Sequence, residues 1–339
     1  MQDPQARVVD LIFGRWRSQI LYAGVKLGIF EALADGSRAA PDIAEQLDLD
    51  PALSYRLLRA LESLELLQED SHRTFSLTDA GHLLRKDHPQ TLRGVTLLEE
   101  GPEHYALWKH LPAMIRDGKQ NAFIREFGRM AFDHAAHDPA YAEVFNEAMS
   151  SYSSTQTAWV LEALDAYDFS SITHICDIGG GHGHTLCGLL ARHPHLRGTV
   201  LELPSAIENE ALLWADKLNV GDRCSYLAGD MFASIPAADA YMMKLVIHDW
   251  NDAECVQILR NVSRAASPGG RVFIIEQVVP GPGTPHFAKL FDIHMMCWGT
   301  GRERTIEEYE DLLESAGWKY AQTWCPTSRM MGAVEGVKA

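Results

Sequence analysis

Short apolar segments alternate with helical patterns over the second half of the chain, and this alternation limits the fold more than any other feature. The expected strands are 174–178, 198–202, 224–228, 240–246 and 271–277. Helical patterns lie between them, over 185–192, 207–218 and 253–266. Strands and helices that alternate in this way form an open, mostly parallel sheet with helices on both faces. The sequence therefore predicts a Rossmann-like, doubly wound α/β domain over residues 166–339.

The 339 residues exceed what a single core usually holds, about 250–300, so at least one more domain is expected. Residues 1–95 contain short helical patterns and one polar hairpin at 66–77. The order helix, turn, helix, wing predicts a winged-helix domain that is all-helical apart from the wing. Residues 96–165 are rich in aromatic side chains and are expected to form a helical linker that contributes to a substrate pocket.

The charge of the chain argues against a nucleic-acid or membrane partner. Lys and Arg number 30 against 46 Asp and Glu, a net charge of −16, and residues 1–93 carry 11 basic against 14 acidic side chains. A winged helix that reads DNA should be basic. We therefore interpret this domain as a dimerisation scaffold: the apolar stripe Leu21, Val25, Ile29 and Phe30 predicts a symmetric homodimer.

The six cysteines show no spacing typical of a metal site, and reduced, packed thiols are expected. No apolar run approaches the roughly 20 residues that span a bilayer. The first residues also lack a basic segment followed by an apolar one. A cytoplasmic location is expected.

A glycine-rich turn follows the first expected strand, in Asp177-Ile178-Gly179-Gly180-Gly181-His182-Gly183. Alone it is compatible with NAD, FAD or S-adenosylmethionine. Glu202 ends the next strand, 23 residues after Gly179, where an acid accepts hydrogen bonds from ribose hydroxyls. Asp230 and Met231 follow the third strand, where they suit an adenine. The glycine spacing is poor for a dinucleotide and good for an amino-acid nucleoside.

With these segments in place, the sequence resembles the S-adenosylmethionine-dependent O-methyltransferases of the plant caffeate, acetylserotonin and bacterial aromatic-polyketide type. The resemblance covers nearly the whole chain and rests on Asp177–Gly183, Glu202–Pro204, Gly229–Phe232, Lys244–Asp252 and Gly301–Thr305. It implies S-adenosylmethionine as cofactor, held by Asp177, Gly179, Gly181, Glu202, Leu203, Asp230, Met231, Phe232, Lys244 and Trp250. Lys244 could equally be a plain strand-end residue, and Trp250 a core residue.

The resemblance also implies the catalytic residues. A phenolic acceptor has a pKa of about 10, so its methylation needs a base. The resemblance gives this role to His248, supported by Glu276 and Glu308, which lie 28 and 60 residues later. On spacing alone, Glu308 would be read as an ordinary helix acid. Asp249 has a purely structural alternative, in which it caps the following helix or holds the loop.

A bulky apolar and aromatic set is expected to line the pocket for a small aromatic or polyketide-like acceptor. Its members are Trp108, Phe127, Phe132, Met149, Tyr152, His294, Met295 and Trp298. No metal is expected. One alternative left open is a C- or N-methyltransferase on the same fold, which could use a metal site formed by His248, Asp249 and His294. The other is a regulator, in which the winged helix binds DNA and the C-terminal domain senses a ligand.

Overall fold

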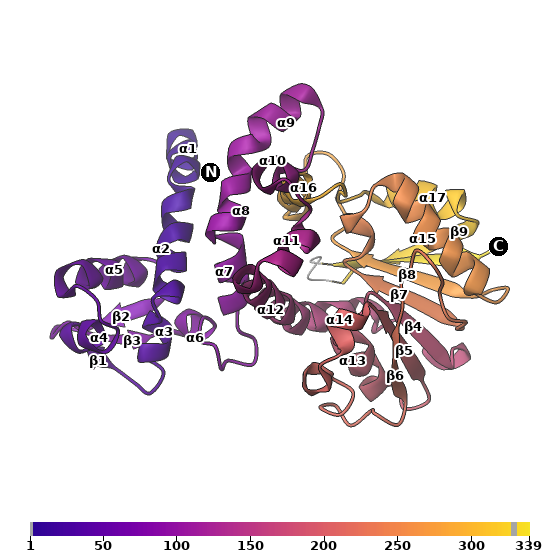
Figure 1. Ribbon diagram of the computed structural model, residues 1–339, viewed down its shortest axis with the longest axis horizontal. Coiled ribbons are helices and arrows are strands. Elements are labelled where there is room, and N and C mark those ends of the chain that lie inside the picture. Colours follow the sequence, from indigo (N-terminus) through magenta and orange to yellow (C-terminus); the bar gives the residue numbers. More distant parts are fainter. Residues whose placement is uncertain (1–2, 327–330) are drawn as a thin grey trace. The chain divides into compact units, whose positions relative to one another are not determined.

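The computed structural model describes residues 3–326 and 331–339, which form two compact units (Figure 1). The first unit contains the chain up to Lys109 together with residues 132–154, and the second contains 110–131 and 155–339. The segment 96–165, expected as a linker, is helical and is divided between the two units.

The first unit is a set of short helices around a small sheet. Its sheet has the order β1-β3-β2, built from β1 (Arg38–Ala39), β2 (Leu67–Glu69) and β3 (Thr74–Leu77). Its helices are α1 (Pro4–Ile12), α2 (Gly14–Lys26), α3 (Ile29–Ala32), α4 (Ala40–Gln46), α5 (Pro51–Ser63), α6 (Asp79–His82), α7 (Arg93–Glu99), α8 (Pro102–Leu107), α11 (Ala131–His137) and the first part of α12 (Pro139–Leu164). The winged-helix prediction is confirmed, and β1 is a third strand that the sequence did not reveal.

Local signals explain the helix boundaries of this unit. Asp50 caps α5: its carboxylate accepts hydrogen bonds from the backbone N–H groups of Ala52 and Leu53. Gly28, at φ 77°, separates α2 from α3. Leu58 and Leu61 of α5 are buried in the core of the unit. The stripe expected to need a partner copy packs in this same core: Val25, Ile29 and Phe30 are buried there and Leu21 packs against them, so the stripe itself does not supply a dimer surface.

The second unit contains a seven-stranded sheet of order β6-β5-β4-β7-β8-β10-β9. Its strands are β4 (His174–Ile178), β5 (Arg197–Glu202), β6 (Cys224–Ala228), β7 (Ala240–Lys244), β8 (Arg271–Glu276), β9 (Trp318–Trp324) and β10 (Gly332–Lys338). The first five are parallel, as predicted, and β10 runs antiparallel to β8 and β9. The two C-terminal strands were not expected.

Helices cover both faces of this sheet, and the alternation of side chains along each strand explains why (Figure 1). Ile175 of β4 faces a core shared with α12 and α13 (His184–Arg192), whereas Cys176 faces one shared with α15 (Asp252–Ala265) and α17 (Ile306–Ser315). The other helices of the unit are α9 (Leu111–Asp117), α10 (Ala122–Phe127), α14 (Pro204–Ile207) and α16 (Ala288–Trp298). In the part of the chain that the structure describes, no helix has the length and apolar character needed to cross a membrane.

One predicted helix is wrong. Residues 207–218 do not continue as an α-helix: α14 ends at Ile207, and a short 3₁₀ turn covers Glu210–Leu212. The cause is tertiary, because the N–H of Trp214 donates to the carbonyl of His182 (3.1 Å) and to the Tyr226 hydroxyl (3.2 Å) instead of to its own helix.

The strand order reverses beside β4, because β5 and β6 lie on one side of it and β7 and β8 on the other. Ligands of open α/β sheets bind at such a switch point, outside the carboxyl ends of the strands. The glycine turn, Glu202, Asp230 and His248 all follow the carboxyl ends of these strands.

Candidate active site

The turn between β4 and α13 has a backbone that requires glycine. Gly179, Gly181 and Gly183 have φ values of 68°, 55° and 84°, in the left-handed region. A Cβ on Gly179 would lie 2.8 Å from Cγ2 of Val246, and one on Gly183 would lie 2.6 Å from the Tyr226 hydroxyl. A Cβ on Gly181 would have nothing within 4 Å, so the turn is open at this residue, close to the N-terminus of α13.

Asp177, the last residue but one of β4, is a buried carboxylate without a hydrogen bond. It is 1% exposed, and neither carboxylate oxygen has a hydrogen-bond partner among the described residues. Burial raises the pKa of Asp177 to about 7, although the charge of Lys244 opposes this rise. The Lys244 ammonium donates to Oε1 of Gln156 at 3.2 Å, and burial lowers its pKa. This pair suits the ammonium and carboxylate of an amino-acid tail.

The ends of β5 and β6 bring further polar groups to the same edge. Both carboxylate oxygens of Glu202 accept backbone hydrogen bonds, from Gly181 (3.0 Å) and from Leu203 (2.7 Å). Asp230 accepts from the N–H of Phe232 at 2.8 Å. The amide of Asn261 donates to the carbonyls of Met231 and Phe232, both at 2.8 Å, which fixes that loop.

Trp250 packs its ring edge-on against Phe232, with ring centroids 4.8 Å apart. The residues expected to hold the cofactor thus come from adjacent strand ends. The buried, unpartnered carboxylate and the open glycine turn fit S-adenosylmethionine.

His248 lies on a 3₁₀ turn, η4 (Ile247–Asp249), that follows β7. The expected strand stops at Lys244 because Leu245 takes a left-handed backbone, φ 53°. Oε1 of Glu276 then accepts the N–H groups of Val246, Ile247 and His248 at 3.0–3.3 Å. Glu276 therefore holds the backbone on which His248 sits.

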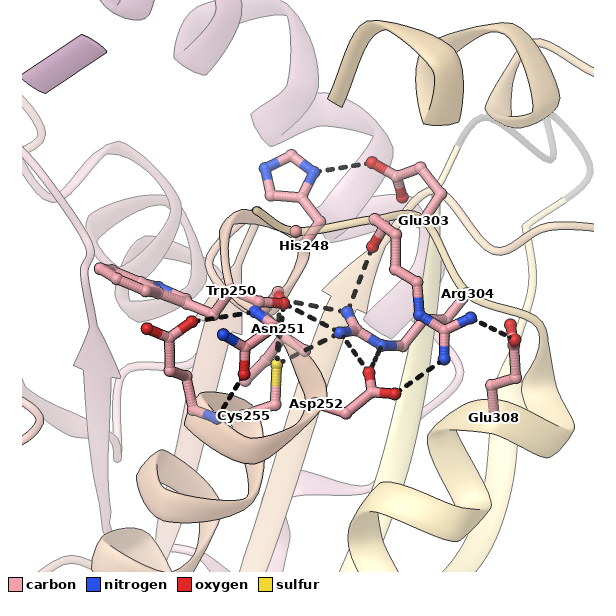
Figure 2. A network of polar contacts seen from close by, with 12 residues as sticks. His248, Trp250, Asn251, Asp252, Cys255, Glu303, Arg304 and Glu308 are labelled. Atoms are coloured by element: carbon pink, nitrogen blue, oxygen red, sulfur yellow. Dashed lines mark hydrogen bonds and ion pairs between the residues drawn. The ribbon is translucent and has the colours of Figure 1, made fainter. Parts of the chain in front are cut away.

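The His248 ring is surrounded by three carboxylates. Its Nδ1 lies 2.7 Å from Oε1 of Glu303 and 3.7 Å from Oε2 of Glu276 (Figure 2 shows the contact with Glu303). Its Nε2 lies 3.6 Å from Oδ1 of Asp249.

These surroundings set the protonation of the cluster. Burial lowers the pKa of His248, but the charges of Glu276, Asp249 and Glu303 outweigh burial and raise it to about 10. Burial also raises the pKa of Asp249 to about 6 and that of Glu276 to about 7. His248, Asp249 and Glu276 therefore all keep their protons to a higher pH than the same groups do in water.

Glu308 does not contact His248, and this corrects the expected arrangement. It is the third residue of α17, where it forms a capping box with Thr305 and an ion pair with Arg302 (2.5 Å). Glu303 has the contact expected of Glu308. Glu303 lies five residues earlier, in the Gly-Arg-Glu-Arg-Thr segment, so the sequence indicated the segment but not which of the two acids contacts His248.

Arg304 fixes the loop after His248 to the segment that carries Glu303 (Figure 2). Its guanidinium is 0% exposed, bonds Asp252 at 2.8 and 3.1 Å, and donates to the carbonyls of Ile247 (3.2 Å) and Trp250 (2.9 Å). Gly301 is required nearby, since a Cβ there would lie 1.8 Å from the His248 carbonyl oxygen.

The residues expected to contact the acceptor are divided between the units. Trp108, Phe132, Met149 and Tyr152 belong to the first unit, and Phe127, His294, Met295 and Trp298 to the second. Within the second unit, Phe291 links His294 to the candidate base: its ring stacks on His294 at 5.2 Å and lies 5.9 Å from that of His248.

The metal trio considered from the sequence is not assembled. In the described part of the chain, the group of possible ligands around His248 consists of His248, Glu276 and Glu303, whose ligand atoms lie within 4.8 Å of one another. Neither Asp249 nor His294 belongs to this group, and the 2.7 Å contact between His248 and Glu303 is a hydrogen bond.

Comparison with known families identifies the chain. Residues 108–319 match an O-methyltransferase domain, and residues 9–87 match the O-methyltransferase dimerisation domain. The chain belongs to the O-methyltransferase family. It is an S-adenosylmethionine-dependent methyltransferase with a Rossmann-like catalytic domain and an N-terminal dimerisation domain.

Individual proteins that are similar to this O-methyltransferase along most of its length are also methyltransferases. It is 33% identical to the phenazine O-methyltransferase PhzM of Lysobacter antibioticus over 97% of this chain and 94% of that protein. It is 32% identical to an 8-amino-8-demethylriboflavin N,N-dimethyltransferase of Streptomyces davaonensis over 88% of this chain and 85% of that one. The crystal structure of human N-acetylserotonin methyltransferase with S-adenosylmethionine is similar, with 25% identity, a TM-score of 0.85, and coverage of 100% and 99%.

Proposed function

We propose that this O-methyltransferase methylates a hydroxyl of a small aromatic or polyketide-like acceptor, with His248 accepting the proton. The observation that carries the proposal is the buried hydrogen bond between His248 Nδ1 and Glu303. It lies at the sheet edge that also carries the glycine turn. The names of the relatives, which include a phenazine O-methyltransferase, support an aromatic acceptor.

In this proposal, residues at the ends of β4 to β7 would hold the cofactor. Asp177 would accept from its ammonium group and Lys244 would pair with its carboxylate, while Gly179 and Gly181 would let the backbone approach. Glu202 would accept from the ribose hydroxyls, and the adenine would be held by Leu203, Asp230, Met231, Phe232 and Trp250. S-adenosylmethionine supplies a methyl group on a sulfonium whose thioether is the leaving group.

The proton chemistry follows from the charges around His248. Its conjugate acid, with a pKa of about 10, is matched to a phenol, whose pKa is also about 10. The acceptor proton passes to Nε2, and Glu303 and Glu276 stabilise the resulting imidazolium at Nδ1. When the proton moves from the phenol to His248, a neutral imidazole and a phenol become an imidazolium and a phenolate, and the number of protons on the pair is unchanged. A phenol acidic enough to be ionised already therefore binds directly as its phenolate, beside the imidazolium.

The proposal also includes the residues that contact the acceptor, the location of the protein and its assembly. The acceptor-contacting roles of the eight aromatic and apolar residues stay predictions, as does the cytoplasmic location. We also propose a homodimer. It is supported by the matching dimerisation domain and by α1, a helix with no buried residue that exposes Val8, Leu11 and Ile12.

An N-methyltransferase is the second candidate, because one relative is an N,N-dimethyltransferase of an aminoriboflavin. Methylation of a basic amine does not need a base to remove a proton before transfer. This alternative therefore predicts that the enzyme stays active without His248.

The test is mass spectrometry of products formed from labelled S-adenosylmethionine and a library of phenols and aromatic amines. We expect a gain of one methyl on phenolic oxygen, located by fragmentation. Methylation confined to nitrogen would establish the second candidate instead. S-adenosylhomocysteine should raise the melting temperature and NAD should not, because only a ligand that binds the native state stabilises it.

A further inference from the structure

Two buried cysteines lie in contact, and one of them follows the glycine turn. Cys187 is on the first turn of α13 and Cys224 begins β6; their Sγ atoms are 3.7 Å apart and share a hydrogen bond. Both side chains are largely buried, at 0% and 9% exposed. A disulfide needs the sulfur atoms at about 2.05 Å, so small side-chain and backbone shifts would be needed to join this pair.

Cys187 is tied to the glycine turn in two ways. Its backbone N–H donates to the carbonyl of Gly183 at 2.9 Å. Its Sγ contacts the Tyr226 hydroxyl at 3.8 Å, and that hydroxyl donates to the carbonyl of His182 at 3.0 Å. Cys187 is therefore connected to the turn once through its backbone and once through its sulfur.

The contact with Tyr226 leaves little room for adjustment. The same hydroxyl accepts from the N–H of Trp214 at 3.2 Å, and the space beside Gly183 is so small that an added Cβ would lie 2.6 Å from it. If α13 shifts toward β6, Tyr226 cannot keep all these contacts with the turn in its present conformation.

Cys224 gives the pair access to solvent. It lines a cavity of about 360 Å³ at the amino-terminal edge of the sheet, together with His174, Arg197 and the exposed residues Gly221 and Asp222. This is the edge opposite the carboxyl ends of the strands, so a small oxidant can approach without passing through the cofactor site.

We propose that Cys187 and Cys224 form a reversible disulfide that weakens cofactor binding by displacing the glycine turn. The oxidant is a small hydroperoxide such as hydrogen peroxide. The inference rests on the proposed function only in that the turn is taken as part of the cofactor site.

The reaction consumes one hydroperoxide and two thiols; with hydrogen peroxide it yields one disulfide and two water molecules. Cys224, the residue of the pair that lines the cavity, attacks one peroxide oxygen through its sulfur: an S–O bond forms, the O–O bond breaks, and the departing hydroxide takes the thiol proton as water. Cys187 sulfur then attacks the sulfenic sulfur: the S–S bond forms, the S–O bond breaks, and hydroxide leaves with the second thiol proton.

The experiment uses the full chain with Cys325→Ser, which removes an exposed thiol that could join two molecules. The protein is treated with hydrogen peroxide, alkylated under denaturing conditions and digested. We expect a mass loss of about 2 Da per disulfide and a cross-linked peptide pair containing Cys187 and Cys224. Absence of this cross-link after peroxide treatment would overturn the proposal.

Calorimetric titration with S-adenosylhomocysteine then measures the consequence. We expect oxidation to weaken binding about tenfold or more, because displacements of about 1 Å near a site can cost up to 10²-fold, and we expect dithiothreitol to restore it. A cross-linked protein with unchanged affinity would refute the coupling. If the reduced protein does not bind this nucleoside, the cofactor placement fails, whereas the peptide map still decides on the disulfide.

Cys224→Ala tests the pair further, and Cys297→Ala, which removes another buried thiol, is the matched control. The Cys224 variant should bind S-adenosylhomocysteine as the reduced parent does and should not respond to peroxide. The Cys297 variant should keep the response. The proposal would be contradicted if peroxide weakened S-adenosylhomocysteine binding by the Cys224 variant as much as it weakens binding by the parent protein. Peptide mapping of the parent protein decides even if a variant folds poorly.

Discussion

At the scale of single residues, the candidate site depends on buried charges that lack full compensation. His248 is stabilised as a cation by three carboxylates, and Asp177 is buried without a hydrogen bond. Such arrangements are costly for an unliganded protein, and perturbed ionisation of this kind is typical of functional sites.

Glu303→Gln removes one of the charges that raise the pKa of His248. The pKa of the imidazolium should fall, so the fraction of neutral base at a given pH should rise. The rising limb of kcat/KM against pH, measured with a weakly acidic phenol, should therefore move to lower pH.

His248→Gln should lower kcat by about 10²–10⁴-fold, the usual contribution of a general base, with little change in S-adenosylhomocysteine affinity.

Glu308→Gln is the matched control, since Glu308 caps α17 and does not contact His248. Its pH profile should follow the wild type. A Glu303→Gln profile that also superimposes on the wild type would reject the proposed support of His248, and full inhibition of the wild type by a chelator would favour a metal at this cluster.

Asp177→Asn should stabilise the unliganded protein at high pH while weakening S-adenosylhomocysteine binding. The folded pKa of about 7 lies above the unfolded value of about 3.9, so the folded state retains a proton between these values that the unfolded state releases. Stability from this group is present at low pH and is lost as pH rises from about 4 to 7.

The variant cannot ionise and avoids that loss. Its melting temperature, measured by calorimetry, should exceed that of the wild type by little at pH 4.5 and by clearly more at pH 8. The difference in stability is on the order of 1.4 kcal/mol per pKa unit. A gap that shrinks as pH rises would show that the sign of the shift is wrong.

At the scale of elements, loops rather than regular structure fix the candidate base. β7 stops at Lys244, Glu276 at the end of β8 binds the next three N–H groups, and Arg304 bonds the loop that follows. Parallel strands place these segments at one edge of the sheet, and the loop conformation sets the direction of the ring.

Arg304→Met tests the contribution of this loop connection. It removes the guanidinium donor from the carbonyls of Ile247 and Trp250, at about 1–3 kcal/mol for each group left unsatisfied, while the half-exposed Asp252 keeps its ion pair with Arg302. At roughly 2–4 °C per kcal/mol for a domain of this size, the melting temperature should fall by on the order of 10 °C. Arg302→Met is the control. Its ion pairs with Asp252 and Glu308 are solvent-exposed and worth about 1 kcal/mol or less, so equal losses in the two variants would disprove this interpretation.

At the scale of the whole molecule, the two units have different tasks. The second carries the candidate cofactor and base residues, and the first matches a dimerisation domain. Its helix α1 exposes Val8, Leu11 and Ile12 and has no buried residue, which is costly for a helix in a monomer.

A second copy of this chain is the partner we expect on α1. Light scattering at micromolar concentration should give twice the mass of the chain, and Leu11→Glu with Ile12→Glu should shift the protein toward monomer. Arg7→Glu, which changes charge on the same helix without removing apolar area, is the control. A wild-type monomer would refute the homodimer.

The sequence alone determined the winged helix, the five parallel strands and the glycine turn. These features follow from local periodicity and from backbone conformations that only glycine adopts readily. It also placed His248 and Glu276 near the ends of two expected strands, 240–246 and 271–277, whereas the pairing of those two strands in the sheet is seen only in the structure.

Only the tertiary structure decided which acid meets His248. Glu303 and Glu308 lie five residues apart in the same segment, and the spacing from His248 could not separate them. The buried Arg304 anchors the start of that segment beside η4, whereas the capping box of α17 takes Glu308. Likewise, the expected helix at 207–218 gave way to the bonds of Trp214 with His182 and Tyr226, since contacts between distant residues outweigh local helix propensity.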